Sequence, residues 1–160
     1  MNPLEPPQAL RGVAFSHLFA LEVVVDALQS IGPLNAERRV GPIASGRFEG
    51  DGLAGRVLAG GSDWQTVTPD GATHLDGRLV LQTDAGELIG MTFSGIRRGP
   101  PEVMARLAAG KDVDPADYYF RIYATFSTGA ERLAWLNQVI AVGTGHRMSS
   151  GPIYNLFEMR

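Results

Sequence analysis

Glycine and proline recur along the whole chain, and their spacing limits what the chain can fold into. The 160 residues include 20 glycines and 10 prolines, which divide the sequence into short segments separated by turn signals. Such a pattern favours many short strands joined by turns over a few long helices. A chain of this length usually forms one domain around one core. We therefore expect a single all-β domain over residues 9–160, preceded by an N-terminal tail over residues 1–8.

Alternating apolar residues indicate where the strands lie. Between residues 17 and 25, Phe19, Leu21 and Val23 alternate with other residues, as in a strand with one buried face. Two strand-like pieces within residues 38–61 are separated by the sequence EGDG, whose glycines can adopt the positive φ angles of a tight hairpin. The sequences PDG and TDAG mark further turns. About nine strands are expected, the later ones around residues 79–81, 88–93, 118–126, 138–145 and 151–159.

Two short helices interrupt the strands. In residues 100–110, Pro101 suits the first position of a helix and Gly110 suits a left-handed end. In residues 128–138, Thr128 and Glu131 have the spacing of a capping box, in which each side chain binds a backbone amide at the helix start. We expect about two to three turns in the first helix and one or two in the second.

The number of short strands favours a closed sheet. An open sheet would leave unpaired edges, which invite aggregation, and closure removes them. We therefore expect a closed antiparallel β-barrel of about 8–10 strands with one or two short helices. In such a barrel every second residue of a strand points inward, and the interior can hold a small ligand. Polar residues on the inward faces are thus the candidates for a functional site.

The charge and composition argue against several partners. The chain has 17 acidic and 14 basic residues, a formal charge of -3 and no basic block, so nucleic acid is not an expected partner. It has no cysteine, which excludes disulfides and thiolate chemistry. The first ten residues lack the basic region of a signal peptide, and no apolar run approaches the roughly 20 residues that span a bilayer. We expect a soluble cytoplasmic protein with no membrane partner.

Motifs for metals and cofactors are missing from the sequence. His17, His74 and His146 do not form a paired metal-ligand spacing, so no metal site is expected. No G-x-S-x-G motif marks a serine nucleophile, and no glycine-rich phosphate loop opens a helix after a strand. We therefore expect no cofactor.

The stretch GGSDWQ places an acid and an amide on one face of a strand. Asp63 and Gln65 are two residues apart, so they point to the same side, with Trp64 on the other. If they point inward, burial would raise the pKa of Asp63 and suit it to general acid or base catalysis. Alternatively, Asp63 caps the preceding glycine turn or pairs with an arginine. The sequence leaves both interpretations open.

The stretch DYYFR gives a second candidate face. Tyr119 and Arg121 share one side of the predicted strand, and an inward arginine needs an acid such as Asp63 or an anionic or carbonyl ligand. The same argument applies to Arg78. We expect Asp63, Arg78, Tyr119 and Arg121 to be the catalytic residues, with the arginines stabilising an oxyanion and Tyr119 donating a proton. The alternative is an ion pair that fixes the strand register, or a ladder on the surface.

Three residues are candidates for substrate binding. Gln65 could orient a substrate oxygen beside Asp63. Trp64 could contact the substrate or belong to the core. Asn137 follows the start of the second predicted helix, where it could bind a ligand or hydrogen-bond to neighbouring backbone.

The motifs taken together resemble a known family. The order GGSDWQ, DG, LDGR, YYFR, WLN and GTGHR is similar to that of the domain of unknown function 3237 family, small β-barrel proteins of bacteria and fungi, over about residues 17–159. The resemblance implies a barrel fold and frequent homo-oligomers. It implies no particular activity, because the family as a whole has no agreed one. Leu79 stands where the family often has an aromatic residue, and Gly46 stands without a second glycine.

Two functions fit these expectations. The first is a cofactor-independent enzyme that uses acid/base chemistry in the barrel on a small, partly apolar carbonyl-type substrate, in an isomerisation, cyclisation, addition or elimination. The second is a non-catalytic carrier or sensor that holds a small molecule in the same cavity. A third possibility is a barrel filled with side chains, in which the polar residues only form ion pairs. We expect a small-molecule ligand and a homo-oligomer, most simply a homodimer.

Overall fold

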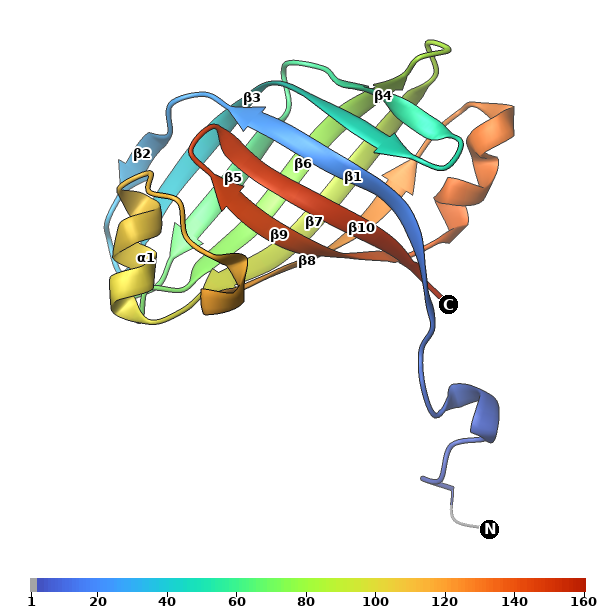
Figure 1. The fold of residues 1–160 in the computed structure, drawn as a ribbon, viewed down its shortest axis with the longest axis horizontal. Helices are drawn as coiled ribbons and strands as arrows, with labels where there is room; N and C mark the ends of the chain where they lie inside the picture. The colour runs from blue at the N-terminus through green and yellow to red at the C-terminus, as the bar shows by residue number, and fades with distance from the viewer. Residues whose placement is uncertain (1–2) are drawn as a thin grey trace.

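One antiparallel sheet dominates the computed structural model, which describes residues 3–160 (Figure 1). Its strands in chain order are β1 (Phe15–Val25), β2 (Gln29–Gly32), β3 (Glu37–Gly50), β4 (Leu53–Val57), β5 (Ser62–Val67), β6 (Thr73–Thr83), β7 (Leu88–Arg98), β8 (Tyr119–Ser127), β9 (Ala141–Met148) and β10 (Gly151–Met159). They pair in the order β1-β10-β9-β8-β7-β6-β4-β3-β2. β1 also pairs with β3, and this pairing closes the sheet.

The barrel has eight closing strands and two additional ones within residues 3–160. β5 is additional because β3 and β6 are long enough to pair with β4 over one part of their length and with β5 over another. β2 extends the sheet beside β3. The closed antiparallel barrel predicted from the sequence is therefore confirmed. The sequence missed β2, since its four residues are largely exposed and show no alternation.

Tight turns at the predicted positions align the strands. The EGDG sequence joins β3 to β4, and Gly52 there has a φ of 71°. TDAG joins β6 to β7, where Gly86 has a φ of 89°. Residues with a Cβ rarely adopt such angles, so glycine is the residue that these turns require. PDG likewise joins β5 to β6, which brings Asp63 beside Gly77 in the neighbouring strand.

Helical segments lie at the two ends of the barrel. α1 (Pro101–Ala108) lies at one end, near β2, and buries Val103 and Leu107 (Figure 1). A 3-10 helix, η3 (Glu131–Gln138), lies at the opposite end and is drawn in orange. It covers that end with Leu133 and Leu136, which are fully buried. Two shorter 3-10 segments are η1 (Gln8–Leu10) and η2 (Pro115–Asp117).

The predicted capping box does not form at η3. The helix begins after Ala130, and no side chain caps its first amides. Thr128 instead accepts a hydrogen bond from the Ala130 amide and donates one to the Leu88 carbonyl. The hydroxyl is therefore engaged in holding the loop against β7, which explains why the capping pattern was wrong here.

The N-terminal segment leads away from the barrel (Figure 1). Residues 8–10 form η1, and Ala14 bonds to the backbone of Arg160 where the segment meets the barrel. Met1 and Asn2, part of the predicted tail, lie outside the described residues. None of the helices in residues 3–160 has the length and apolar character needed to cross a membrane.

A continuous apolar core fills the barrel and includes residues of α1 and η3 at its two ends. Along β8, Phe120, Ile122, Ala124 and Phe126 point inward and alternate with exposed residues. Burying each of the larger side chains stabilises the folded state by about 1.5–3 kcal/mol. Towards the α1 end, buried polar side chains stand beside these apolar ones. Among them are Asp63 and Gln65 on β5 and Arg97 on β7, and both of these strands pair with β6.

Candidate functional site

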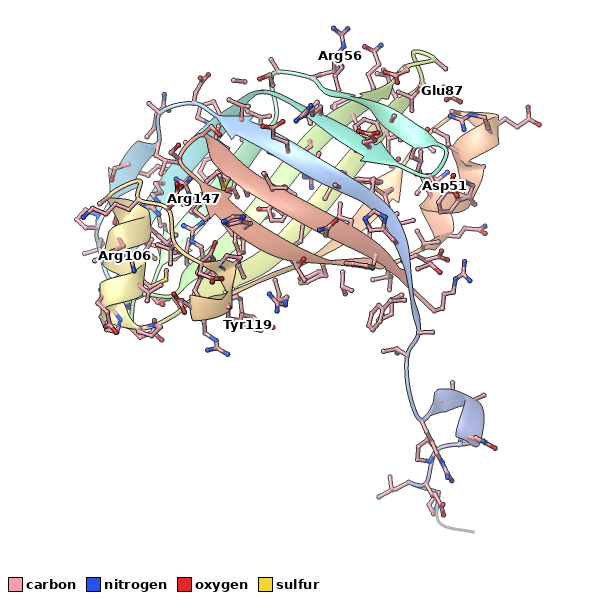
Figure 2. The ribbon with its side chains drawn as sticks, in the orientation of Figure 1. Asp51, Arg56, Glu87, Arg106, Tyr119 and Arg147 are labelled. Carbon is pink, nitrogen blue, oxygen red and sulfur yellow. The ribbon has the colours of Figure 1, made fainter. Side chains whose placement is uncertain are left out.

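A polar cavity of about 350 Å³ lies inside the barrel near the β1–β2 and β9–β10 connections. Figure 2 shows Arg147, one of its lining residues, at the end of the barrel that carries α1, whereas Asp51 and Glu87 lie at the opposite end. The side chains that give the cavity its polar character are Arg39, Asp63, Gln65, Arg97, Arg147 and Tyr154, and Asp26 lies exposed at its rim.

A chain of hydrogen bonds orients Asp63. Gln65 Nε2 donates to Asp63 Oδ2 at 2.9 Å, and Arg39 Nε donates to Gln65 Oε1 at 2.8 Å. The alternation of β5 turns Asp63 and Gln65 inward together, and β3 supplies Arg39 opposite Gln65 in the register. Asp63 Oδ1 is buried and has no hydrogen-bond partner within residues 3–160. One carboxylate oxygen is therefore fixed and the other is free.

Burial gives Asp63 an unusual acidity. Desolvation raises its pKa from 3.8 to about 6. The Gln65 hydrogen bond and the positive charges of Arg97 and Arg39 oppose this rise, whereas Asp76 adds to it. A carboxyl group with a pKa near 6 can exchange a proton with a substrate near neutral pH.

Two more arginines bring positive charge into the cavity. Arg97 on β7 is only 6% exposed, and desolvation together with the charges of Arg147 and Arg39 lowers its pKa to about 10. It stays protonated at neutral pH, but its Nε has no hydrogen-bond partner within residues 3–160. Arg147 on β9 is half-buried, and its backbone N–H donates to the Tyr118 hydroxyl at 2.8 Å. Burial likewise lowers the pKa of Arg147.

Tyr154 on β10 adds a neutral hydroxyl group. It is fully buried, and desolvation raises the pKa of its phenol well above 10.0. Its hydroxyl has no hydrogen-bond partner within residues 3–160. The ring packs at 5.9 Å from the Phe93 ring centroid and at 5.4 Å from the Phe120 centroid, so neighbouring aromatic residues hold it in place.

Phe120 supports both Tyr154 and Arg97. The Arg97 guanidinium carbon lies 5.3 Å from the Phe120 ring centroid, within the range of a cation–π contact. Gly145 on β9 leaves room for this ring, since a Cβ there would lie 2.6 Å from two of the Phe120 ring atoms. The packing of β8 against β9 thus positions the polar groups of the cavity.

The three unpartnered polar atoms have complementary chemistry. Asp63 Oδ1 accepts a proton, the Tyr154 hydroxyl can donate a hydrogen bond, and Arg97 Nε–H carries positive charge. Unsatisfied buried polar groups are rare in folded proteins, and each is explained by an ordered water, an ion, a ligand or a functional role. Residues 3–160 hold no group of three or more His, Asp or Glu side chains placed to bind a metal ion. The carboxylate oxygen, the hydroxyl and the guanidinium N–H suit proton transfer and oxyanion binding.

The structure brings together only part of the predicted catalytic set. Asp63 lies in the cavity, but Arg78, Tyr119 and Arg121 point to the outside of the barrel. Arg78 and Arg121 therefore do not point inward to pair with Asp63, and the surface position that the sequence left open is the one observed. The error is one of face: on β6 and β8 the inward positions are those of Gly77 and Phe120, one residue away in each case.

The predicted substrate-binding residues also separate. Gln65 lies in the cavity beside Asp63. Trp64 is 50% exposed on the outer face of β5, where its Nε1 donates to Ser62. Asn137 lies in η3 at the far end of the barrel, and its side chain accepts from the Thr128 amide and donates to the Thr128 carbonyl. Asn137 therefore holds a loop, as the alternative interpretation proposed.

Sequence reasoning missed four residues of the cavity: Arg39, Arg97, Arg147 and Tyr154. A signal for Arg97 was present, because it lies an even number of residues from the buried Ile89, Met91 and Phe93 and so shares their face. The same test applied to the GPIYNLFEM stretch places Tyr154 with Leu156. Which strands meet across the barrel could not be read from spacing.

Tyr119 and Arg121 line a different and larger hollow. It has a volume of about 760 Å³, lies on the outside of β7, β8 and β9, and is mainly apolar. Arg121 and Arg98 both stack on the Tyr119 ring, with guanidinium carbons 5.1 Å and 4.6 Å from its centroid. Figure 2 shows Tyr119 at the outer edge of the barrel. No buried unpartnered polar atom lies among its lining residues, so we place the candidate active site in the smaller cavity.

Comparisons with known proteins agree with the barrel. Residues 13–159 match the family described as protein of unknown function, DUF3237. A UPF0311 protein of Rhodopseudomonas palustris strain TIE-1 is 30% identical over 144 residues, which cover 89% of this chain and 94% of the relative. The chain therefore belongs to the DUF3237 family.

Three solved structures share the fold. A β-barrel-like protein of Acinetobacter baumannii has a TM-score of 0.82 and 38% identity, covering 98% of this chain and 99% of its own. The protein of unknown function RPA1785 of Rhodopseudomonas palustris has a TM-score of 0.88 and 30% identity, and the match covers 93% of this chain and 98% of that protein. A structure described as an enzyme from Penicillium herquei has a TM-score of 0.70 at 19% identity, covering 92% and 95%. At that identity the likeness shows the fold alone.

Proposed function

We propose that this member of the DUF3237 family is a cofactor-independent enzyme that performs acid/base chemistry on a small, partly apolar carbonyl compound. The observation that supports this most is the buried Oδ1 of Asp63, which has no hydrogen-bond partner within residues 3–160, in a residue that lines the cavity. Tyr154 and Arg97 line the same cavity, and the Tyr154 hydroxyl and the Arg97 Nε also have no partner within these residues. The reaction class is an isomerisation, cyclisation, addition or elimination. Each of these can proceed through an enol or enolate.

Asp63 is the proposed general base. Its pKa near 6 leaves it mostly ionised at neutral pH, so Oδ1 can take a proton from the carbon next to the substrate carbonyl. The electron pair of the broken C–H bond then forms the enolate C=C bond, and the carbonyl oxygen becomes an oxyanion. The Tyr154 hydroxyl donates a hydrogen bond to this oxyanion, and the nearby positive charge of Arg97 stabilises it. Protonated Asp63 returns the proton to another carbon in an isomerisation, or to the departing group in an elimination. In an addition or cyclisation the enolate carbon forms a bond to a second carbonyl carbon, whose C=O π electrons move to oxygen, and Asp63 protonates the alkoxide that results.

The hydrogen-bond chain keeps the base in one orientation. Gln65 holds Oδ2 of Asp63, and Arg39 holds Gln65, which leaves Oδ1 as the oxygen without a partner within residues 3–160. Preorganised groups of this kind lower the cost of reaching the transition state. The fold likeness to the Penicillium herquei enzyme is consistent with catalysis in this type of barrel, although at 19% identity it carries no site residues across.

Solvent deuterium exchange tests the proposal without knowledge of the product. A panel of small enones, lactones and aromatic ketones in D₂O is followed by NMR for exchange of the hydrogens next to the carbonyl. We expect the wild type to accelerate exchange for at least one compound and the Asp63→Asn variant to lose this acceleration by about 100-fold or more. Asp51→Asn, in an exposed turn at the opposite end, is the matched control. Equal rates for wild type and Asp63→Asn with every compound would refute the base role.

A carrier or sensor is the second candidate, because the cavity alone could hold a small molecule. It differs in one observable: a ligand would bind and be recovered unchanged after hours with the protein. We also propose, as the sequence suggests, a cytoplasmic homodimer whose barrel domain spans residues 9–160 after a tail over residues 1–8.

A further inference from the structure

We propose that the substrate of this cavity carries a carboxylate, which Arg97 and Arg147 bind while the carbonyl end of the same molecule faces Asp63 and Tyr154. The ligand class is thus a small oxo acid. This inference rests on the proposed function for the carbonyl end, whereas the anion site stands on the geometry of the arginines and would exist in a carrier as well.

The charges of the cavity are unbalanced. Three guanidinium groups, from Arg39, Arg97 and Arg147, line it together with the single interior carboxylate of Asp63. Asp26 also lines it, but it is exposed at the rim, where water screens its charge. None of the ion pairs formed within residues 3–160 involves any of these groups. The interior therefore carries an excess of positive charge that a bound anion would neutralise.

The excess of positive charge acts on Arg97. Its side chain is buried, and the charges of Arg147 and Arg39 lower its pKa in addition to desolvation. A buried charge without a partner is costly, and arginine is almost never buried unless it is paired. The Phe120 ring on one side and the unpartnered Nε leave the guanidinium fixed and able to donate. A planar carboxylate is the group that a guanidinium binds with two parallel hydrogen bonds.

The position of Asp63 favours a carboxylate over a phosphate. At about 350 Å³ the cavity lies at the small end of ligand sites. A phosphate dianion would bring a second negative charge towards the carboxylate of Asp63, and like charges in a buried site repel each other. A monovalent carboxylate balances the arginines with less repulsion. The cavity also offers Tyr154 as a donor for a second oxygen of the ligand.

Calorimetry with matched pairs of probes tests the anion site. Levulinate, benzoate and 4-hydroxybenzoate are each compared with their neutral methyl esters, and inorganic phosphate is titrated separately. We expect at least one carboxylate to bind ten-fold or more tightly than its ester, and more weakly as salt is added. Esters that bind as well as every acid would overturn the proposal, as would phosphate binding more tightly than every carboxylate.

Two arginine variants locate the site, and a third serves as control. Arg97→Met and Arg147→Met should each weaken the preferred carboxylate by ten-fold or more while leaving its ester unaffected. Arg78→Met removes a guanidinium from the outer face and should change neither. If Arg97→Met does not fold, Arg147→Met, whose side chain is only half-buried, still decides the question. Unchanged carboxylate affinity in Arg147→Met would overturn the proposed contact.

Proton uptake links the anion to Asp63. A carboxylate bound nearby raises the pKa of Asp63, so at pH 6.5 binding should draw protons from the buffer in the wild type and not in Asp63→Asn. Titrations in two buffers of different ionisation enthalpy measure this uptake. Binding with uptake but without deuterium exchange would retain the anion site and reject the enzyme. Deuterium exchange without any preference for acids over esters would retain the enzyme and reject the anion site.

Discussion

Gln65 Nε2 lies 2.9 Å from Asp63 Oδ2 and, by binding that one oxygen, leaves the buried Oδ1 of the same carboxylate without a hydrogen-bond partner within residues 3–160. Both residues are on β5, two positions apart, so the strand itself creates the pair. Arg39 holds the amide of Gln65 from β3. The acidity and orientation of Asp63 therefore depend on a neutral neighbour as well as on the nearby charges.

The first prediction concerns that hydrogen bond. Gln65→Leu should raise the pKa of Asp63 further, because the bond to Gln65 favours the ionised form. It should also cost about 1–3 kcal/mol of unfolding free energy, since a buried acceptor loses its donor. Carboxyl ¹³C titration by NMR measures the pKa. Gln82→Leu, which removes an exposed amide bound to Arg56, is the control and should leave Asp63 unchanged. A fall in the pKa of Asp63 in Gln65→Leu would contradict the proposed role of the amide.

The second prediction is a pH dependence of stability. The pKa of Asp63 is raised from 3.8 in the unfolded chain to about 6 in the barrel, so the folded state binds the proton more tightly. Its contribution to stability is fully present below pH 3.8 and is lost as the pH rises through about 6. At about 1.4 kcal/mol for each pH unit, the loss is about 3 kcal/mol. The titratable or charged neighbours that act on Asp63 are Arg39 on β3, Asp76 on β6, Arg97 on β7, Arg147 on β9 and Tyr154 on β10.

Comparison with Asp63→Asn isolates this contribution from those of other groups. Urea unfolding of both proteins between pH 4 and pH 7.5 should show the variant gaining stability relative to the wild type as the pH rises. Parallel curves over this range would mean that Asp63 is not desolvated as its burial indicates.

The parts of this molecule that sequence could predict are those with a local cause. Glycine at positive φ in EGDG and TDAG fixes hairpins within a few residues, and alternation places Asp63 and Gln65 on one face. The expectation that Arg121 points into the barrel was wrong, because alternation shows which residues share a face but not which of the two faces is inside. The arginines whose charges act on Asp63 come from β3 and β7, and the sequence spacing between these strands contains no information about closure of the barrel.

The third prediction is that Arg97, which we propose binds the ligand carboxylate, lowers the free energy of unfolding of the unliganded protein. Arg97→Met should leave the free energy of unfolding unchanged or raise it by up to about 3 kcal/mol, because a buried, uncompensated charge is replaced by an apolar chain of similar length. The pKa of Asp63 should rise at the same time, since a nearby positive charge is lost. Thermal unfolding and NMR titration measure the two effects. Arg56→Met, on an exposed arginine, should show neither. A destabilisation above about 3 kcal/mol would show that Arg97 is a structural residue with a partner inside the folded chain.

The fourth prediction concerns Gly145. A methyl group there would collide with the Phe120 ring at 2.6 Å, so Gly145→Ala should displace the ring on which Arg97 and Tyr154 pack. Overpacking of this kind typically costs about 1–3 kcal/mol. Gly129→Ala, whose added methyl group would meet nothing within 4 Å, is the matched control. The Tm of both variants and their affinity for the preferred carboxylate are to be compared. Equal Tm and equal affinity would mean that the ring yields without effect on the cavity.

The last prediction is that the outer groove of β7, β8 and β9 forms the interface of the expected homodimer. Phe15 and Tyr123 line this groove and are 53% and 59% exposed, and Ile96, Tyr119 and Phe157 add to its apolar surface. A contiguous exposed apolar surface of this kind is typical of association sites. Phe15 also marks the point where the N-terminal segment leaves the barrel, so in a two-fold arrangement the segment of one copy lies near the groove of the other.

Light scattering should therefore give twice the 17.2 kDa mass of one chain for the wild type. Tyr123→Lys places a charge in the groove and should yield monomers, because a buried unpaired ammonium opposes association. Val80→Lys makes the same change on the exposed face of β6, outside the groove, and should stay dimeric. A monomeric wild type would reject the dimer, and a dimer that survives Tyr123→Lys would place its interface on another face. Because the groove is separate from the cavity, Tyr123→Lys should keep the affinity for carboxylates, so association and ligand binding can be tested independently of each other.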